Sequence, residues 1–438
     1  MTFEEVRALL ESSGADAWEL TEERRHVREF YFIRRKLDQH RLREVREFRI
    51  KVYRLFDDGK YLGSAGGSLS PTADRAETEA LLQNWLKAAA FVRNPAYTLV
   101  PPEEGAGEKT SVSSVDTAKL AADFLSVMRA LPETETEGIN SFELFTGEYE
   151  TRFANSRGVD RKESGPRAAL EVVLNARDGG HEIELYRMIT AGGCDRETLS
   201  RSLARALSLA KDRLQAGPTP TLKKCDVLFS TEVALPLYEY FADRLDAAYK
   251  VRGYSDWEIG KPIAEDAKGD RVTLHSVPFL PNSSENSAFD AEGATIHETL
   301  MMENGVPRHF LGSRQFSCYL GLADSFRPGN LSFSGGTHTE EQLRTGAYLE
   351  AVEFSDFQVN PVTGDIAGEI RLAYWHDGAA VTPVTGGSVS GNMADFLKDF
   401  RMSRETMQID SCVIPAFTRL PGVSIAGVSA ADKEVSHV

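Results

Sequence analysis

The residues that come nearest to a catalytic motif are His297 and Glu298. They begin like the His-Glu-x-x-His signature of zinc proteases, but Met301 occupies the position of the second histidine. Residues 295–302 also have the apolar character of a strand, whereas that signature needs a helix to bring both imidazoles to one face. We therefore expect His297 to be a structural or surface residue.

Other familiar motifs are incomplete. A phosphate-binding loop needs Gly-Lys followed by Ser or Thr, but residues 107–110 place Glu108 between the glycine and the lysine, and Gly260-Lys261 is followed by proline. A nucleophile elbow would need a serine at the centre of residues 387–391, where valine stands. The remaining candidate ligands are solitary histidines: His275, His309, His338 and His376. These residues alone define no catalytic site.

The elements that would position a site are recognisable near the N-terminus. Thr2 and Glu5 form a capping box that predicts a helix from residue 3. Alternating apolar and charged residues predict a strand that ends in a hairpin turn over residues 57–60 and continues over residues 61–69. Ser70-Pro71 then predicts the start of a long helix, because proline is favoured at the first helical position.

The pattern of apolar and turn-forming residues changes after the Gly/Pro-rich residues 216–220. A helix is expected over residues 233–249, and short apolar strands separated by turn residues follow it. We predict an α+β protein in which a mixed N-terminal region of strands covered by helices precedes a β-rich, sandwich or barrel-like C-terminal domain. The expected parts are an N-terminal α+β domain (1–100), a linker (101–114), a central α+β domain (115–217), the β-rich domain (221–428) and a tail (429–438).

Composition excludes several classes of protein. A formal net charge of -16 argues against nucleic-acid binding, which needs clustered Lys and Arg. The basic stretch 24–54 is interrupted by glutamates and predicts solvated strand faces, with a peptide-binding wall as the alternative. No apolar run is long enough for a membrane span, and residues 1–6 do not begin a secretory signal. Four scattered cysteines without a Cys-x-x-Cys pair indicate a cytoplasmic protein.

Several Gly/Asn/Asp turns, in their order and spacing, resemble the TldD/PmbA metalloprotease family, once labelled modulators of DNA gyrase. Each turn alone is weak, but the set and the pattern of hairpin and helix over residues 48–93 extend the resemblance over nearly the whole chain. The positions that carry it are Asn155, Ser156, Gly158, Asp290, Glu292, Gly293, Gly364, Asp365, Gly391 and Asn392.

In catalytic members of this family, a His-Glu-x-x-x-His helix and a distant cysteine bind zinc, and the glutamate serves as general base. The matching residues here are 238–243. Glu239 occupies the general-base position, but Tyr238 and Asp243 replace both histidines. Tyrosine is a poor zinc ligand because its pKa is about 10. Cys412 lies near the region of the third ligand and is most simply a buried cysteine.

The resemblance implies a metal-free TldE/PmbA-type subunit, with zinc only in a TldD-like partner. The pair, a heterodimer or else a homodimer, would trim unfolded peptides such as leader or antitoxin segments in the cytoplasm. Two alternatives stay open. One is a self-sufficient homodimeric metallopeptidase that draws ligands from His297, His309 or Asp243. The other is a peptide-binding protein without protease activity.

Overall fold

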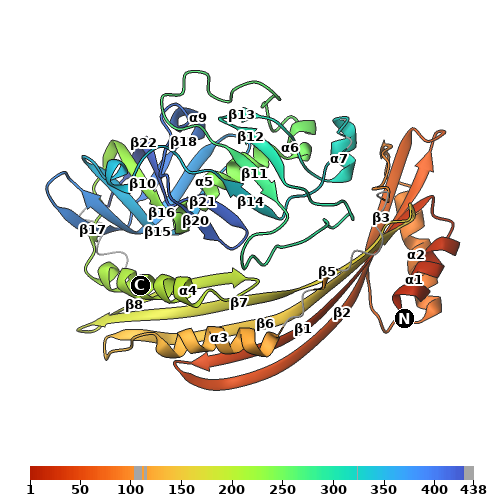
Figure 1. Cartoon of the computed structure of the whole chain (residues 1–438), viewed down its shortest axis with the longest axis horizontal. Coiled ribbons are helices and arrows are strands. Elements are labelled where there is room, and N and C mark those ends of the chain that lie inside the picture. Colours follow the sequence, from red (N-terminus) through yellow and green to blue (C-terminus); the bar gives the residue numbers. More distant parts are fainter. Residues whose placement is uncertain (103–110, 113–115, 323, 429–438) are drawn as a thin grey trace.

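A long, curved, mostly antiparallel sheet runs along one side of the molecule, and a β-rich unit packs on it (Figure 1). The computed structural model describes residues 1–102, 111–112, 116–322 and 324–428. Within these ranges, none of the helices has the length and apolarity needed to cross a membrane.

Four strands of the long sheet, β1, β2, β6 and β7, have 17–21 residues, against an average strand of about 5–6. The strand order of the sheet is β4-β3-β2-β1-β6-β7-β5, with β8 paired to β7. The predicted hairpin is confirmed, because β2 ends and β3 begins on either side of residues 57–60, where Gly59 has a φ of 84°. The strands are β1 (Ala17–Ile33), β2 (Lys36–Phe56), β3 (Tyr61–Leu69), β4 (Asn94–Pro95), β5 (Ser111–Val112), β6 (Glu137–Asn155), β7 (Asp160–Asp178) and β8 (His181–Ala191).

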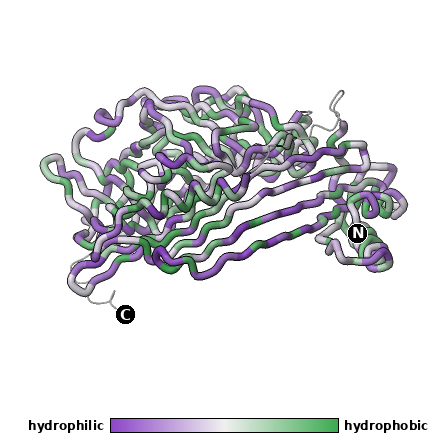
Figure 2. Tube along the Cα trace, turned by 60° about the horizontal axis from the view of Figure 1, so that its bottom comes forward, coloured by the Kyte–Doolittle hydropathy of each residue, from purple (hydrophilic) through white to green (hydrophobic). Residues whose placement is uncertain are grey.

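The charged residues of the basic stretch pair with one another across this sheet. Arg46 donates to Glu22 at 2.5 Å, and Arg49 lies 3.1 Å from Glu23 on the adjacent strand. Figure 2 shows hydrophilic colours along much of the long strands. Opposite charges on neighbouring strands stabilise an antiparallel pair, so the stretch serves the sheet itself.

Helices cover the sheet at its two ends. The first pair, α1 (Phe3–Ser12) and α2 (Arg75–Ala89), packs on one end. The predicted capping box of α1 is confirmed. The prediction that the next helix begins at Ser70-Pro71 is wrong, because Asp74 accepts from the Glu77 backbone at 2.8 Å and caps α2 there.

The second pair, α3 (Thr117–Ala130) and α4 (Arg196–Leu214), buries its apolar side on β6, β7 and β8 at the other end. As expected, Asp195 caps α4 by accepting from the backbone of Glu197 and Thr198.

The C-terminal unit contains a closed five-stranded ring, because β15 pairs with β16 as well as with β10. Its order is β15-β10-β22-β18-β16, so the expected barrel-like domain and the α+β class are confirmed. The two short strands β17 (Val381–Thr385) and β9 (Gly217–Pro218) extend it. The ring strands are β10 (Leu222–Ser230), β15 (Tyr348–Val359), β16 (Asp365–His376), β18 (Ser388–Asn392) and β22 (Phe417–Ala426), with β19 (Arg401–Met402) paired to β22.

A smaller sheet, β13-β12-β11-β14-β21-β20, completes this unit. Residues 295–302 were expected to form a strand, but only residues 299–303 do so; residues 295–298 are irregular apart from a single bridge between Thr295 and Phe289. Short helices α7 (Arg314–Tyr319), α8 (Glu340–Leu343) and α9 (Met393–Phe396) lie between strands. The strands are β11 (Leu274–Val277), β12 (Thr299–Glu303), β13 (Val306–Pro307), β14 (Asn330–Phe333), β20 (Thr406–Ile409) and β21 (Cys412–Pro415).

Helix α5 (Thr231–Arg244) packs against β15 of the ring and β21 of the smaller sheet. The single helix expected over residues 233–249 is wrong, because α5 ends at Arg244. The Asp246 carboxylate accepts from the Ala248 and Tyr249 backbone and starts a new helix, α6 (Ala247–Val251).

The predicted division into domains stays a prediction, although two of its parts share one sheet. Strand β1 pairs with β6, so residues 1–100 and 115–217 are joined by backbone hydrogen bonds. Within the predicted linker, residues 111–112 form β5 on β7. Residues 103–110 and 113–115 and the predicted tail at 429–438 lie outside the described residues.

We expect Leu203→Ala to lower the free energy of unfolding by about 2–5 kcal/mol, because Leu203 is fully buried between α4 and the sheet. Urea unfolding measures the loss. Arg201→Ala on the same helix, whose side chain is 71% exposed, should change stability by less than about 0.5 kcal/mol. Equal losses in both variants would contradict this packing.

Candidate functional site

Helix α5 presents three different faces to its surroundings. Tyr238, Phe241 and the following Leu245 point into the core. Glu239 and Asp243, four residues apart, share a second face. The third face carries Tyr240 and Arg244 and borders a pocket.

Tyr238 fills the place where the sequence comparison expects the first zinc-binding histidine. Its side chain is fully buried, and its hydroxyl lies 2.6 Å from the Thr418 hydroxyl. Its ring packs edge-on against Phe333 at 4.9 Å between centroids. Burial raises the pKa of the Tyr238 phenol above its ordinary value, so the oxygen stays protonated and committed to Thr418.

Cys412 on β21 lies within electrostatic reach of Tyr238 and Glu239. It is buried and free, and burial followed by the negative charge of Glu239 raises the pKa of its thiol to about 12. Zinc binds the thiolate rather than the thiol. Cys412 is therefore a buried thiol that would have to lose its proton to bind a metal.

The two carboxylates of α5 lie within electrostatic reach of each other. Protein atoms around the Glu239 carboxylate desolvate it and raise its pKa, although the residue as a whole is exposed at the surface of the helix. Burial, followed by the charges of Glu239 and Asp246, raises the pKa of Asp243 to about 6. The structure thus brings Tyr238, Glu239, Asp243 and Cys412 into one neighbourhood.

These residues do not fit a zinc ion. The two histidine positions carry a buried phenol, Tyr238, and a single carboxylate, Asp243, so only the Cys412 thiol of the family's ligand set would remain. In the part of the chain that the structure describes, no three His, Cys, Asp or Glu side chains are grouped so that they could hold a metal ion.

The histidines considered as substitute ligands are engaged elsewhere. His297 Nε2 lies 3.8 Å from Asp324, and its ring packs edge-on against Phe326. His309 Nδ1 lies 2.7 Å from the Leu300 carbonyl oxygen. Neither histidine forms a metal-binding group with Asp243 among the described residues.

The first group of family-motif positions builds the turn between β6 and β7. The Asn155 side chain donates to the Val100 carbonyl at 2.9 Å and accepts from the backbone of Arg157 and Val159. Ser156 accepts from the Trp18 backbone at 3.1 Å. Gly158 has a φ of +97°, which favours glycine. These residues shape the turn of the chain.

The second group, Asp290, Glu292 and Gly293, forms a loop against this turn. Asp290 accepts from the backbone of Glu292, Ala294 and Arg327, all at 2.9 Å. Burial, only partly offset by these donors, raises its pKa to about 6. Glu292 accepts from the Arg314 backbone at 2.7 Å. The loop locks the C-terminal unit onto the long sheet.

The third group joins two loops beside the pocket. Asn392 donates to Asp365 at 2.8 Å and to the Thr363 carbonyl, and it caps α9. Hydrogen bonds from Asn392 and Thr363 lower the pKa of Asp365. Gly364 has a φ of +77°, and a Cβ on Gly391 would lie 2.2 Å from the Phe396 ring. The motif positions are therefore structural turns.

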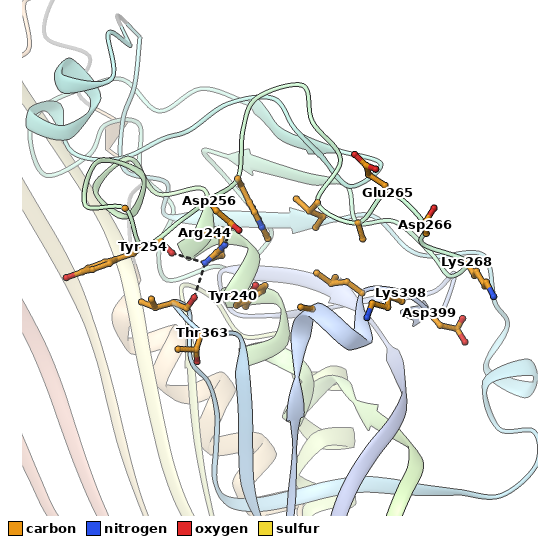
Figure 3. A pocket seen from close by; sticks show the side chains of 17 residues that line it. Tyr240, Arg244, Tyr254, Asp256, Glu265, Asp266, Lys268, Thr363, Lys398 and Asp399 are labelled. Carbon is orange, nitrogen blue, oxygen red and sulfur yellow. Dashed lines mark hydrogen bonds and ion pairs between the residues drawn. The ribbon is translucent and has the colours of Figure 1, made fainter.

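A pocket of about 910 Å³ lies on the third face of α5 (Figure 3). Its walls include Tyr240 and Trp257, and its buried charge is Arg244, which is 6% exposed. Arg244 donates to the carbonyls of Tyr254 and Val362 and to the carboxylate of Asp256.

Sequence analysis missed this pocket. Its residues come from the end of α5, the loop 253–268, the turn at 362–363 and the segment 394–399. The aromatic residues of the loop 253–257 are the feature of the sequence that could have indicated a pocket, but no local pattern predicts that they lie beside Arg244.

Asp243→Asn should make the protein less sensitive to pH. The raised pKa means that folded protein holds the Asp243 proton longer than unfolded protein does, so Asp243 makes the wild type lose stability as pH rises from about 4 to about 6. The free energy of unfolding of Asp243→Asn, measured relative to that of the wild type, should therefore increase as the pH rises across this range. Glu232→Gln, at an exposed position of the same helix, is the control. A constant difference between Asp243→Asn and wild type would contradict the raised pKa.

Gly293→Ala should destabilise the protein more than Gly158→Ala. Both glycines have positive φ, which costs an alanine about 1–2 kcal/mol. At Gly293 the new Cβ would also lie 2.6 Å from the Phe153 ring, whereas at Gly158 the nearest atom is 3.9 Å away. The contact adds about 1–3 kcal/mol. Chemical denaturation compares them, and equal losses would rule out the close packing at Gly293.

Comparisons with known proteins agree with this arrangement. Residues 108–214 match the PmbA/TldA metallopeptidase central domain, and residues 222–427 match the PmbA/TldA metallopeptidase C-terminal domain. A protein of Methanothermobacter thermautotrophicus named a metalloprotease is 27% identical over 58% of this chain and 59% of its own length. An uncharacterised protein of Methanocaldococcus jannaschii is 25% identical over 57% of this chain and 60% of its own. The chain thus spans about three-fifths of these relatives.

Solved structures share the whole fold. TldE from Thermococcus kodakarensis superposes with a TM-score of 0.76 at 16% identity, covering 97% of this chain and 99% of that one. A Thermotoga maritima structure described as a modulator of DNA gyrase gives 0.75 at 18%, covering 97% and 100%. At such identities the likeness shows the fold alone. The two domain matches, which together span most of the sequence, show more: this chain belongs to the PmbA/TldD metallopeptidase family.

Proposed function

We propose that this chain is the non-catalytic, metal-free subunit of a peptidase in which a TldD-like partner supplies the zinc. The observation that carries the proposal is the state of Tyr238. A zinc ligand at that position would have to leave the Thr418 hydroxyl and lose a proton in a fully buried site. Both steps oppose metal binding.

The rest of α5 supports the same proposal. Glu239 keeps the general-base position, but a general base needs a metal-bound water to activate. Asp243 is a single carboxylate in place of an imidazole, with a pKa that burial has raised to about 6. The helix thus keeps the glutamate of the catalytic motif but lacks both of its zinc-binding histidines.

Peptides are the proposed substrate of the pair, as leader or antitoxin segments to be trimmed. Support comes from the metalloprotease name of the Methanothermobacter relative and from the metallopeptidase domains that match here. We also infer a cytoplasmic location, supported by four free cysteines, which suit a reducing compartment.

The pocket beside α5 favours one competing function, a peptide-binding protein that works without a protease. A self-sufficient homodimeric metallopeptidase has less support, because His297 and His309 are engaged with Asp324 and the Leu300 carbonyl.

Purification without added metal tests the subunit role. We expect well below one zinc per chain by elemental analysis and no peptide hydrolysis by the chain alone, with hydrolysis appearing after it is mixed with a paralogue that carries His-Glu-x-x-x-His. Near-stoichiometric zinc with activity in the isolated chain would support the self-sufficient enzyme instead. Peptide binding without activity in any mixture would support the binding protein.

Glu239→Gln refines this test within the active mixture. Because Glu239 would have no metal-bound water to act on, the variant should support peptide hydrolysis within about twofold of wild type. The corresponding glutamate-to-glutamine change in the partner's motif is the matched control and should abolish turnover. A loss of 100-fold or more from Glu239→Gln, on the scale of a lost general base, would assign this chain a catalytic role.

A further inference from the structure

The pocket beside α5 combines aromatic walls with one buried positive charge (Figure 3). The Arg244 guanidinium carbon lies 5.3 Å from the centre of the Trp257 ring and 5.8 Å from that of Tyr240. A buried guanidinium is costly unless acceptors surround it. The hydrogen-bond acceptors of Arg244 therefore indicate what kind of ligand the pocket can bind.

One edge of this guanidinium is incompletely occupied. Nη1 donates to the carbonyls of Tyr254 at 2.8 Å and Val362 at 3.1 Å, and Nη2 donates to Asp256. Nε is buried and has no acceptor among the described residues. Nε and Nη2 form the edge of an arginine that receives a carboxylate through two parallel hydrogen bonds. Asp256 uses only half of that edge.

Asp256 is also placed where it can be replaced. Its side chain is 86% exposed, whereas the Arg244 side chain is 8% exposed. A carboxylate that moves from this position enters water directly, so the main cost of its departure is the unpaired guanidinium, which a ligand carboxylate would pair again. The departure of Asp256 would leave a buried guanidinium edge open towards the pocket, with the Trp257 and Tyr240 rings beside it.

We propose that this pocket binds the C-terminal residue of a peptide when that residue has an aromatic or large apolar side chain. The terminal carboxylate takes the Nε–Nη2 edge of Arg244 in place of Asp256, and the side chain packs on Trp257 and Tyr240. The choice of a peptide rests on the proposed function. The binding itself needs neither zinc nor the partner subunit.

The charges at the rim set a second condition on the ligand. Three carboxylates, Glu265, Asp266 and Asp399, line the pocket together with two lysines, Lys268 and Lys398. The one excess negative charge favours a positive charge some distance from the ligand's own carboxylate. A peptide with a basic residue upstream of its aromatic C-terminus meets both conditions.

Calorimetric titration of the isolated chain tests the proposal with the peptide Lys-Ala-Ala-Phe as free acid and as C-terminal amide. The amide cannot form the charged pair, so we expect it to bind at least about tenfold more weakly than the acid. N-acetylphenylalanine separates a peptide site from a site for small aromatic acids and should also bind at least about tenfold more weakly, since it lacks the basic residue. Equal affinity for acid and amide, or for acid and N-acetylphenylalanine, would overturn the proposal.

Two variants assign the carboxylate to Arg244. Arg244→Gln should weaken binding of the acid at least about tenfold and leave the amide unchanged. Because Arg244 also holds two backbone carbonyls, Asp256→Asn provides a test at an exposed position. It removes the competing carboxylate and should strengthen acid binding about fivefold or more, without affecting the amide.

Asp266→Asn is the matched control for Asp256→Asn, because it removes the same charge from the rim without touching Arg244. It should not strengthen acid binding beyond about twofold. Unchanged or weaker binding by Asp256→Asn would overturn the proposal. That failure would leave the subunit role intact, because mixing with the zinc-bearing paralogue tests the role separately.

Discussion

Helix α5 has to bury one side against the barrel and the smaller sheet at the same time, and this packing determines what its other two faces can do. Tyr238 and Phe241 enter an aromatic cluster with Phe333 and Phe400, whose ring centroids lie 4.9–6.5 Å apart. Side chains in such a core cannot move without opening a cavity. The ring of Tyr238 is thereby fixed, and its hydroxyl reaches Thr418 on β22.

This packing supports the proposal that the chain keeps a metallopeptidase fold without binding a metal. A buried histidine pair would need ionisable neighbours and a route for water, whereas the tyrosine replaces them with apolar surface and a single hydrogen bond. The carboxylates of Glu239 and Asp243 remain at the border of the core, where they repel each other and hold protons more tightly than free carboxylates do. Arg244 follows Asp243 directly and ends the same helix, where its guanidinium pairs with the Asp256 carboxylate.

Local chemistry made much of the fold predictable. Capping residues such as Thr2 and Asp195 bond to the backbone two or three residues ahead, so short sequence patterns locate those helix starts. The hairpin at residues 57–60 was similarly local. The start of α2 was misplaced because the pattern Asp74-Glu77 competes with Pro71, and the break after Arg244 was missed because Asp246 caps a second helix inside one apolar pattern. Closure of the barrel depends on the pairing of β15 with both β10 and β16, which no local pattern records.

The candidate site was predicted in part for the same reason. The helix positions 238, 239 and 243 follow from an alignment of motifs, whereas the place of Cys412 beside them depends on how β21 packs on α5. Whether Tyr238 points into the core is a property of the packing, and the pocket around Arg244 is assembled from loops whose convergence depends on the tertiary fold.

The pairing of β1 with β6 affects how the chain folds. Glu19 lies opposite Asn155, so the sheet cannot be completed until a long intervening stretch has been synthesised and brought back. Such non-local pairing is slow, and the β1–β3 meander meanwhile presents an unpaired edge to other nascent chains. The alternating arginines and glutamates of β1 and β2 are charges of the kind that discourage edge-to-edge aggregation. The residues that pair across the finished sheet would thus also make that edge a poor template for other chains before the sheet is complete.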